Sequence, residues 1–363
     1  MTVPLPLSAF ARLPSPVEAR LVDGLPAAID QVTGAGPPER SFLRHGWYAA
    51  AIGAYGGRPR TLIVTDEESR CPLVALPIVD VGPRGLGLGC IPGCYWPMRG
   101  VPATQDATPV AWTALALALR RSVRALRVGP VPDGDPAMAG LLTAARARGW
   151  ATIDRVVAQG WLLDLTATDW PRGSTLRKNR FHEKHLAAHG AVDWRFLGGA
   201  DWPAAFDLLA GVERASWIAT ATDGRDAKFS SDSHGGFWRA AARDPVLAAA
   251  MSAAVLTIDG RPAAFSFDLD AGTTRYAIAN SYDPAFAKHS PGRLLQYRNL
   301  ARARAMGIER VDWGMGDAGY KQAMGATAGP LLRDWLLLRP GLPALLGRMM
   351  AGRWRASGAM PAR

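Results

Sequence analysis

The chain has 363 residues, 48% of them hydrophobic and 20% charged, so a globally disordered protein is excluded and the length predicts two domains. A formal net charge of +11 favours polyanionic partners, such as a nucleotide cofactor, RNA or an anionic membrane surface. Three cysteines, Cys71, Cys90 and Cys94, are too few for a disulfide scaffold and suit a reducing cytosol. We interpret Cys90 and Cys94 as buried thiols rather than as a metal or redox site.

The first ten residues contain neither Lys nor Arg, and they lack the charged and apolar regions of a signal peptide. No uninterrupted apolar run reaches the roughly 18 residues that a membrane-spanning helix needs. We therefore expect a cytoplasmic protein without a transmembrane segment.

Residues 1–40 are rich in proline and small residues. We interpret them as an N-terminal arm with a short helix at Val17–Asp23, which Gly24 would end. A first domain is expected over residues 41–155, beginning with a helix that Ser41 caps. Strands and helices then alternate in an α/β pattern. We predict strands at Arg60–Thr65, Leu73–Val79, Leu126–Val131 and Ile153–Asp164, and helices at Trp112–Leu126 and Asp135–Gly149.

A glycine-rich stretch follows the second of these strands, from Gly82 to Gly93. Gly85, Gly87 and Gly89 alternate, and glycines of this kind let a backbone loop approach a phosphate. A phosphate-binding loop also needs a helix directly after it, and none is predicted there. We therefore favour a wide hairpin loop.

A basic helix is predicted from Ser174 or Thr175, either of which can cap it, to His189. Its cationic side chains are expected to face a groove between the two domains. There they would attract an anionic acceptor. The residues assigned to this role are Arg177, Lys178 and Arg180.

Three histidines share one face of the same helix, since His182, His185 and His189 are spaced at i, i+3 and i+7. That spacing could bind a metal ion. No carboxylate completes a recognised ligand set, so we favour a solvated basic face and expect no metal.

The remaining helices before the last third are expected at Trp202–Ala215 and Gly236–Ala242, with a substrate-facing polar loop at Trp217–Gly236. Three short strands follow. They are separated by the turns Asp259-Gly260 and Ala271-Gly272 and should form an antiparallel meander. We predict these strands at Ala253–Ile258, Ala263–Leu269 and Thr274–Ala279.

A loop from Tyr282 leads into a helix that Gly307 ends. We then predict a strand at Ile308–Trp313, a turn at Gly314–Gly319, a short helix at Tyr320–Gly325 and a strand at Leu331–Leu338. The tail, residues 341–363, is basic and contains methionines. It could lie on a membrane surface, but we favour a frayed, solvated terminus.

The start of the helix after Tyr282 has the features of a phosphate site. Pro291 suits the first helical position, Gly292 lets backbone approach a phosphate, and Arg293 adds a positive charge. The helix dipole and the first unpaired amides favour an anion there. An ordinary helix start is the alternative. We assign cofactor binding to Ser290, Pro291, Gly292, Arg293 and Leu294.

Two motifs resemble a known family: Y-D-P-A-F-A-K-H-S-P-G-R-L-L from Tyr282 and V-D-W-G-M-G-D-A-G-Y-K-Q-A-M-G from Val311. They resemble the BioF2-like, or CelD-like, acetyltransferase domain of the GNAT superfamily, which is similar to Fem-type aminoacyltransferases. The resemblance covers roughly 160–335 and implies two GNAT-like domains of α/β (α+β) class, with mixed, mostly antiparallel sheets flanked by helices. The active domain would span residues 156–340. Met324-Gly325 departs from relatives that carry an aromatic residue before the glycine.

The resemblance implies acyl transfer from acetyl-CoA or another acyl-CoA to an amine or hydroxyl. This chemistry needs a base for the acceptor and an acid for the leaving thiolate. Tyr320 is expected to be the acid, Asp317 the base, and Lys321 a stabiliser of negative charge. Packing, helix capping and surface charge, respectively, are the alternative roles. Trp217, Tyr282 and Asp312 are added to the basic helix as substrate-binding residues.

The expected acceptor is a small molecule, or a saccharide or lipid-linked sugar of exopolysaccharide or cell-envelope synthesis. A first alternative is aminoacyl transfer from charged tRNA, as the Fem resemblance and the positive charge permit. A second is a catalytically inactive binding protein that keeps the fold. The sequence predicts neither the oligomeric state nor the acyl chain.

Overall fold

The computed structural model describes residues 16–83, 85–202, 204–216, 227–316 and 319–358. The strands in these ranges form one mixed sheet in the order β1-β2-β3-β4-β5-β12-β6-β11-β10-β9-β8-β7. The pairs β4–β5 and β10–β11 are parallel, and the other neighbours are antiparallel. The predicted α/β class, with a mixed and mostly antiparallel sheet flanked by helices, is confirmed, although the expected sheets are continuous with one another.

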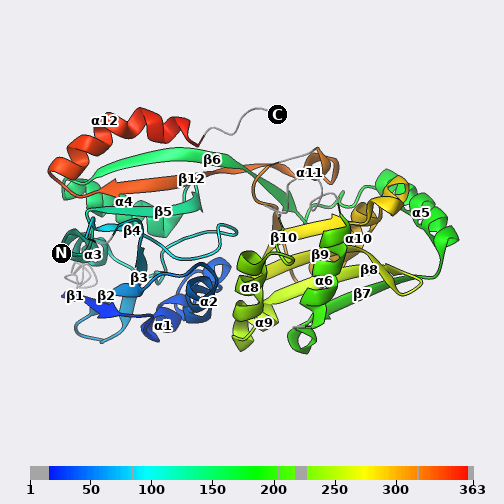
Figure 1. The fold of residues 1–363 in the computed structure, drawn as a ribbon, viewed down its shortest axis with the longest axis horizontal. Helices are drawn as coiled ribbons and strands as arrows, with labels where there is room; N and C mark the ends of the chain where they lie inside the picture. Colours follow the sequence, from blue (N-terminus) through cyan, green and yellow to red (C-terminus); the bar gives the residue numbers. More distant parts are fainter. Residues whose placement is uncertain (1–15, 84, 203, 217–226, 317–318, 359–363) are drawn as a thin grey trace, which may run out of the picture.

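The first half of the molecule contains one end of this sheet (Figure 1). Its strands are β1 (Val17–Asp23), β2 (Pro59–Asp66), β3 (Pro72–Asp80), β4 (Leu88–Cys90) and β5 (Ala125–Pro132). Its helices are α1 (Ala28–Gly34), the 3-10 helix η2 (Pro38–Arg40), α2 (His45–Tyr55), α3 (Pro109–Ser122) and α4 (Pro136–Ala147). The two helices of this domain expected after residue 100 are therefore confirmed, with shifted ends.

Two predictions at the N-terminal side are wrong. Val17–Asp23 is a strand rather than a helix, paired residue by residue with β2. Alternate side chains of this strand face the core, where Val17 and Ala19 pack, and alternation is the period of a strand. Ser41 does not cap α2, because it follows η2, and the residue before α2 is Arg44.

The glycine-rich stretch from Gly82 to Gly93 contains β4, which pairs antiparallel with β3. The next helix, α3, begins only at Pro109. The hairpin interpretation is therefore confirmed. Cys90 is half-buried in β4, Cys94 is buried in the segment that follows, and both thiols are free.

The second half contains the other end of the sheet. Its strands are β7 (Val192–Gly198), β8 (Met251–Ile258), β9 (Arg261–Ala271), β10 (Thr274–Tyr282) and β11 (Arg310–Asp312), so the predicted meander β8–β9–β10 is confirmed. Its helices are α5 (Gly173–Leu186), η3 (Ala187–His189), η4 (Gly199–Asp201), α6 (Ala204–Ala215), α8 (Asp232–Ala241), α9 (Pro245–Ala250), η5 (Pro284–His289), α10 (Pro291–Ala305) and α11 (Tyr320–Ala323). The sequence did not predict β7 or α9.

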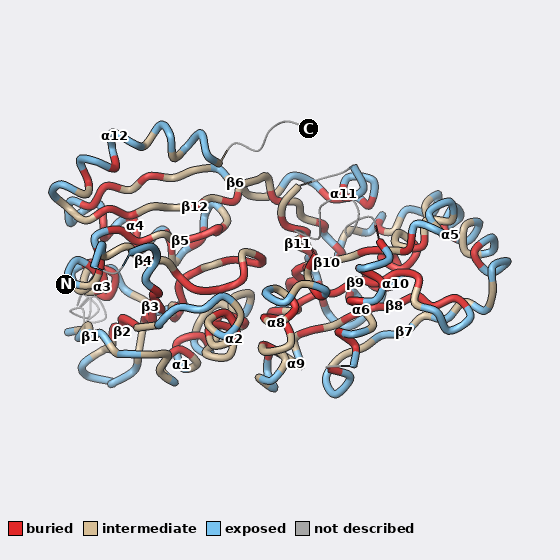
Figure 2. Tube along the Cα trace, in the orientation of Figure 1, coloured by how far each residue is buried: buried red, intermediate tan, exposed pale blue. Residues whose placement is uncertain are grey.

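Two long strands join the halves. β6 (Ala151–Asp164) pairs with β12 (Thr327–Leu338) over most of its length and with β11 at its last three residues. Buried segments run through the strands of both halves (Figure 2). One hydrophobic core crosses between them, since Trp47 of α2 packs edge-on against Phe237 and Trp238 of α8, with ring centroids 4.8 and 5.8 Å apart. The division of the chain at residues 41, 156 and 341 stays a prediction.

The expectation of a frayed tail is wrong for residues 342–356. They form helix α12 (Leu342–Ala356), which packs along β6 through Ala344 and Gly347. Among the described residues, none of the helices combines the length and the apolar character needed to cross a membrane.

Candidate active site

The start of α10 lies where two helices meet. Asp283 fixes the 3-10 helix η5, which precedes α10. Its carboxylate caps η5 by accepting from the Ala285 amide at 2.9 Å, and it binds Arg261 at 2.8 Å. Ser290 then takes a left-handed conformation, with φ of 52°, which turns the chain into α10. Pro291 is the first residue of that helix, as predicted. The first amides of α10 therefore have the orientation that favours an anion.

Gly292 faces the ring of Tyr282, the last residue of β10. A Cβ atom at Gly292 would lie 3.0 Å from Tyr282 Cδ1, so the glycine permits a close approach of helix to strand. Leu294 and Leu295 are buried with Leu256 and Ala264, and they fix this end of α10 on the sheet. Leu294 is thus a core side chain, and only its backbone is available to a cofactor.

The parallel strands β10 and β11 separate next to this helix. Their pairing ends at Tyr276 and Asp312, whereas β10 continues to Tyr282 through an irregularity between Ala277 and Ala279. Ligands of open α/β sheets bind where the carboxyl ends of neighbouring strands diverge. We call this divergence the strand split.

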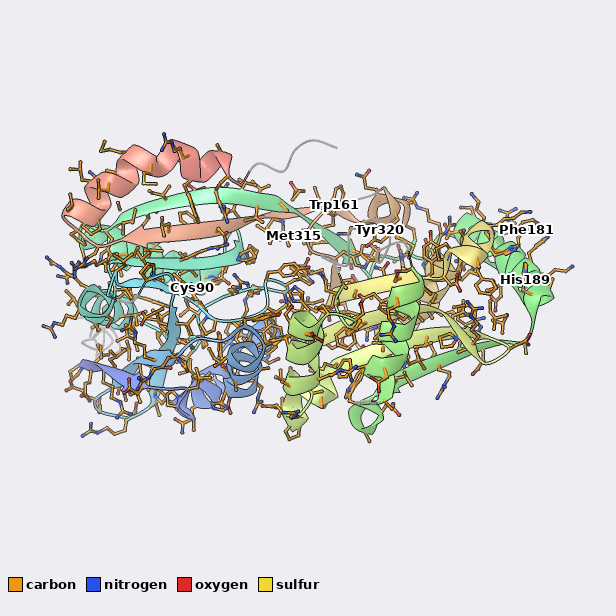
Figure 3. All side chains as sticks on the ribbon, viewed as in Figure 1. Cys90, Trp161, Phe181, His189, Met315 and Tyr320 are labelled. Carbon is orange, nitrogen blue, oxygen red and sulfur yellow. The ribbon has the colours of Figure 1, made fainter. Side chains whose placement is uncertain are left out.

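The first half supplies one wall of the strand split. Trp96 Nε1 donates to the Ala277 carbonyl at 2.9 Å, and a Cβ atom at Gly314 would lie 2.7 Å from the Trp96 ring. In the view of Figure 3, Met315, Tyr320 and Trp161 all appear in the region where the two halves join. The sequence did not predict a role for Trp96, and its position beside a glycine-rich segment was the available signal.

Tyr320, predicted from the sequence as the acid, is the first residue of α11. Its hydroxyl accepts from Asn280 Nδ2 of β10 at 3.4 Å, and its ring packs edge-on against Trp313, with centroids 6.2 Å apart. Asn280 lies beyond the last pair of β10 and β11, so the Tyr320 hydroxyl reaches the strand split. As a residue, Tyr320 is 39% exposed.

Lys321 is buried, and its ammonium donates to backbone carbonyls of the loop after β11. The acceptors are Trp313 and Met315 at 2.8 Å and Gly314 at 3.4 Å. These contacts hold the loop that carries one side of the strand split. The geometry favours a positioning residue over a direct stabiliser of the reacting oxygen.

Replacing Lys321 by Met tests this interpretation. Buried carbonyls would lose their donors, so we expect the free energy of unfolding to fall by about 3 kcal/mol. Lys184→Met, at an exposed position of α5, is the control, with an expected change within about 0.5 kcal/mol. Urea unfolding measures both. Wild-type stability in the Lys321 variant, together with a loss of kcat, would instead favour the role in catalysis.

Asp312 lies at the end of β11, where it accepts from the Gly314 amide at 2.9 Å. Burial raises the pKa of this carboxyl to about 6, while that hydrogen bond and the charges of Arg40 and Lys321 oppose the rise. A carboxylate of this kind can accept a proton near neutral pH. Asp317 and Trp217, which the sequence also assigned to the site, lie outside the described residues.

A buried polar network holds α10 against β9. Arg275 binds Asp270 with two hydrogen bonds of 2.7 Å and donates to Asn299 Oδ1 at 2.9 Å, and Asn299 Nδ2 donates to Asp268 at 2.7 Å. Burial raises the pKa of Asp268 to about 6, against the opposing charge of Arg275. The network fixes the helix whose first turn forms the candidate phosphate site, and the sequence analysis missed it.

The basic helix α5 is not where it was expected. Phe181 and His189 of this region lie at the end of the molecule far from the first half (Figure 3). The prediction that Arg177, Lys178 and Arg180 face a groove between the domains is therefore wrong, because they belong to the same helix. α5 packs instead against η5 and α10. Burial lowers the pKa of His182, and the nearby charges of Arg293 and Lys178 lower it further. Cationic side chains of α5 and α10 therefore gather near the candidate phosphate site.

The three histidines of this region do not converge. His185 Nδ1 lies 2.8 Å from the Phe181 carbonyl, and His189 Nε2 lies 2.8 Å from His289 Nε2. In the part of the chain that the structure describes, no group of three or more His, Cys, Asp or Glu side chains could hold a metal ion.

A polar cavity of about 350 Å³ lies between the start of α5, α10 and α11. Its lining includes Arg172 and Ser174 from α5 and its approach, Tyr297 from α10, and Gln322 from α11. Tyr320 and the first turn of α10 are not among its lining residues.

Comparisons with known proteins give one family match and several structural likenesses. Residues 173–322 match the family model described as acetyltransferase (GNAT) domain. FemX has the same fold, with a TM-score of 0.60 and 11% identity over 92% of this chain and all of that chain. The C-terminal domain of a protein assigned as a lysylphosphatidylglycerol synthetase from Agrobacterium fabrum is also similar. It has a TM-score of 0.52 and 17% identity over 93% of this chain and 98% of that chain.

A conserved protein of unknown function from Bacteroides thetaiotaomicron is also similar, with a TM-score of 0.55 and 12% identity over 88% of this chain and all of that one. No curated protein sequence matches the chain. The structural likenesses show the shared fold, and the family match covers residues 173–322 within it. Residues 173–322 are therefore similar to acetyltransferase (GNAT) domains, within a fold that the solved structures share.

Proposed function

We propose that the protein transfers an acyl group from acetyl-CoA or a longer acyl-CoA to an amine or hydroxyl acceptor. The observation that carries the proposal is the arrangement of the α10 start, the strand split and the Tyr320 hydroxyl on adjoining elements. In this proposal the amides after Ser290 and the charge of Arg293 hold the pyrophosphate. The thioester then lies in the strand split beside Tyr320.

The proposed reaction is a direct attack. The acceptor nitrogen or oxygen bonds to the thioester carbonyl carbon, the carbon–sulfur bond breaks, and the thiolate takes a proton from Tyr320. A base removes the acceptor proton. Asp317 was the first candidate from the sequence. Asp312 is a second candidate, since it lies at the strand split and its pKa is raised toward neutrality.

For the acyl acceptor we propose only a broad chemical class, whereas the proposed acyl donor is an acyl-CoA. We keep the BioF2-like subfamily and an acceptor of exopolysaccharide or cell-envelope synthesis as part of the proposal, with action in the cytoplasm, where CoA thioesters are made. Arg177, Lys178 and Arg180 are proposed to bind phosphates of either the cofactor or an anionic acceptor. Their packing beside η5 and α10 supports this assignment.

The test is calorimetric titration of the full-length protein with acetyl-CoA and with longer acyl-CoA, followed by mass spectrometry of products from candidate acceptors. We expect saturable binding in the micromolar range. Failure to bind any CoA ester would contradict the proposal and would favour an inactive binding protein with the same fold.

Aminoacyl transfer from charged tRNA is the second candidate. The cationic side chains of α5 beside the α10 start, and the fold shared with FemX, favour it. A tRNA donor would bind with an affinity that falls steeply with salt, because phosphate contacts release counterions. Tight, salt-dependent tRNA binding without acyl-CoA binding would replace the first proposal by this one.

A further inference from the structure

Helix α12 has an unusual distribution of side chains. Small residues, Ala344, Gly347 and the half-buried Ala351, face the protein, and a Cβ atom at Gly347 would overlap Leu338. Large apolar residues at i, i+3, i+4 and i+7 face the solvent, with exposures between 49% and 76%. These residues, which we call the apolar stripe, are Leu342, Leu345, Leu346 and Met349.

The orientation of α12 is fixed by its C-terminal end. Arg155 of β6 lies over the Trp354 ring at 4.2 Å, binds the buried Asp334 at 2.7 Å and donates to Ser357 Oγ at 2.7 Å. The helix therefore cannot rotate to bury the apolar stripe without breaking these contacts. In Figure 1, α12 is the outermost layer over β6. The exposure of the stripe thus follows from how the fold holds the helix.

The charged residues of the chain segment that carries the apolar stripe are all basic. Residues 335–363 contain no Asp or Glu. Arginines of α12 accompany the stripe, and further arginines of the chain before α12 and around α3 line the hollows beside it. The arginines on α12 are Arg348, Arg353 and Arg355. The arginines before α12 and around α3 are Arg120, Arg121, Arg124 and Arg339. Such a surface is complementary to an anionic partner.

An apolar cavity of about 730 Å³ continues inward from the apolar stripe. Leu346, Met350 and Trp354 of α12 form one side, and Leu88 and Leu336 of the sheet lie among the residues on the other. Aliphatic surface with this depth can receive hydrocarbon, while arginines at its rim can reach phosphates.

We propose that α12 docks the protein on an anionic lipid bilayer. The apolar stripe enters the boundary between headgroups and acyl chains, and the arginines bind lipid phosphates. A second copy of the chain is a poorer occupant, because a symmetric contact through α12 would bring its arginines against one another. The proposal does not depend on the proposed function.

Co-sedimentation of the full-length protein with vesicles tests this. One set contains phosphatidylcholine alone, and the other also contains phosphatidylglycerol. We expect binding to the anionic set that weakens with salt, since each arginine near such a surface contributes about fivefold in affinity. Replacing Arg348, Arg353 and Arg355 together by Gln should remove most of the preference for anionic vesicles.

The decisive variant is Leu345→Glu with Met349→Glu, for which we expect a loss of about 100-fold in vesicle affinity. Val246→Glu with Met306→Glu is the matched control, since both positions are exposed but lie on α9 and at the end of α10. All variants should melt at the wild-type temperature. Equal losses in the two pairs, or no vesicle binding by the wild type, would overturn the proposal. So would a wild-type dimer, seen by sedimentation, that only the α12 pair dissociates.

Discussion

Replacing Tyr320 by Phe is expected to lower kcat by about 100-fold while the affinity for acyl-CoA stays unchanged. The change keeps the ring and its contact with Trp313 but removes the proton proposed for the leaving thiolate. It also removes the acceptor for Asn280 Nδ2, a contact of 3.4 Å that is too long to carry much stability. Steady-state kinetics and acyl-CoA titration of the same preparation measure the two quantities.

Tyr55→Phe is the matched control for this change. Tyr55 is 40% exposed, almost the same as Tyr320, and its hydroxyl also has a side-chain partner, His234 at 2.8 Å. We expect the control to retain kcat. A folded Tyr320 variant with full kcat, under conditions where chemistry is rate-limiting, would leave Tyr320 as a packing residue. Loss of cofactor affinity instead would mean that its hydroxyl binds the cofactor.

The pH dependence of the same reaction tests Asp312 as the base. Burial raises the pKa of Asp312 to about 6, so the carboxylate form needed to accept a proton is lost as pH falls below that value. We expect kcat/KM to fall on the acid side of this pKa. Asp312→Asn should abolish most activity at every pH. An unchanged profile in Asp312→Asn would exclude it and leave Asp317 as the candidate.

Replacing Gly292 by Val is expected to abolish measurable acyl-CoA binding. A branched side chain at the second residue of α10 would cover the amides proposed to hold the pyrophosphate. It would also meet Tyr282, since even a Cβ atom would lie 3.0 Å from that ring. Calorimetry of the variant gives the answer, and undiminished binding would contradict the cofactor assignment.

Two further variants separate the causes of the loss. Gly211→Val, in α6, where a Cβ atom would meet nothing within 4 Å, controls for the general effect of valine in a helix. Tyr282→Ala combined with Gly292→Val removes the clash but keeps the side chain over the amides. If binding stays lost in the double variant but not in Tyr282→Ala alone, blocked access to the amides is the cause.

The sequence predicted the local parts of this site and missed the contacts that assemble it. Pro291 and Gly292 identify a helix start because their effects are local to the backbone. The contacts of Trp96 with Ala277 and Gly314 join residues far apart in the chain, and no local pattern encodes them. The position of α5 was misjudged for the same reason, since its charge predicts an anion but not which element it packs against.

Edges and ends of the sheet were also difficult to predict. β1 mixes charged and apolar residues as a partly exposed strand does, and a short amphipathic helix of the same composition is equally consistent with it. In α12 the burial of small residues and the exposure of large ones inverts the usual pattern, so hydrophobicity alone did not indicate a packed helix.

The path of β6 links the two halves of this protein into one sheet. The GNAT match begins at residue 173, yet β11, inside the match, is hydrogen-bonded on one side to β6, which ends at Asp164. β12, which follows the C-terminal end of the match, pairs with the same β6 on one side and with β5 of the first half on the other. Dividing the chain at any one position between β1 and β12 therefore leaves at least one strand of the sheet without its hydrogen-bonded neighbour. Recombination that exchanges residues 173–322 alone would leave β11 with an unpaired edge, so we expect the two halves to evolve as one unit.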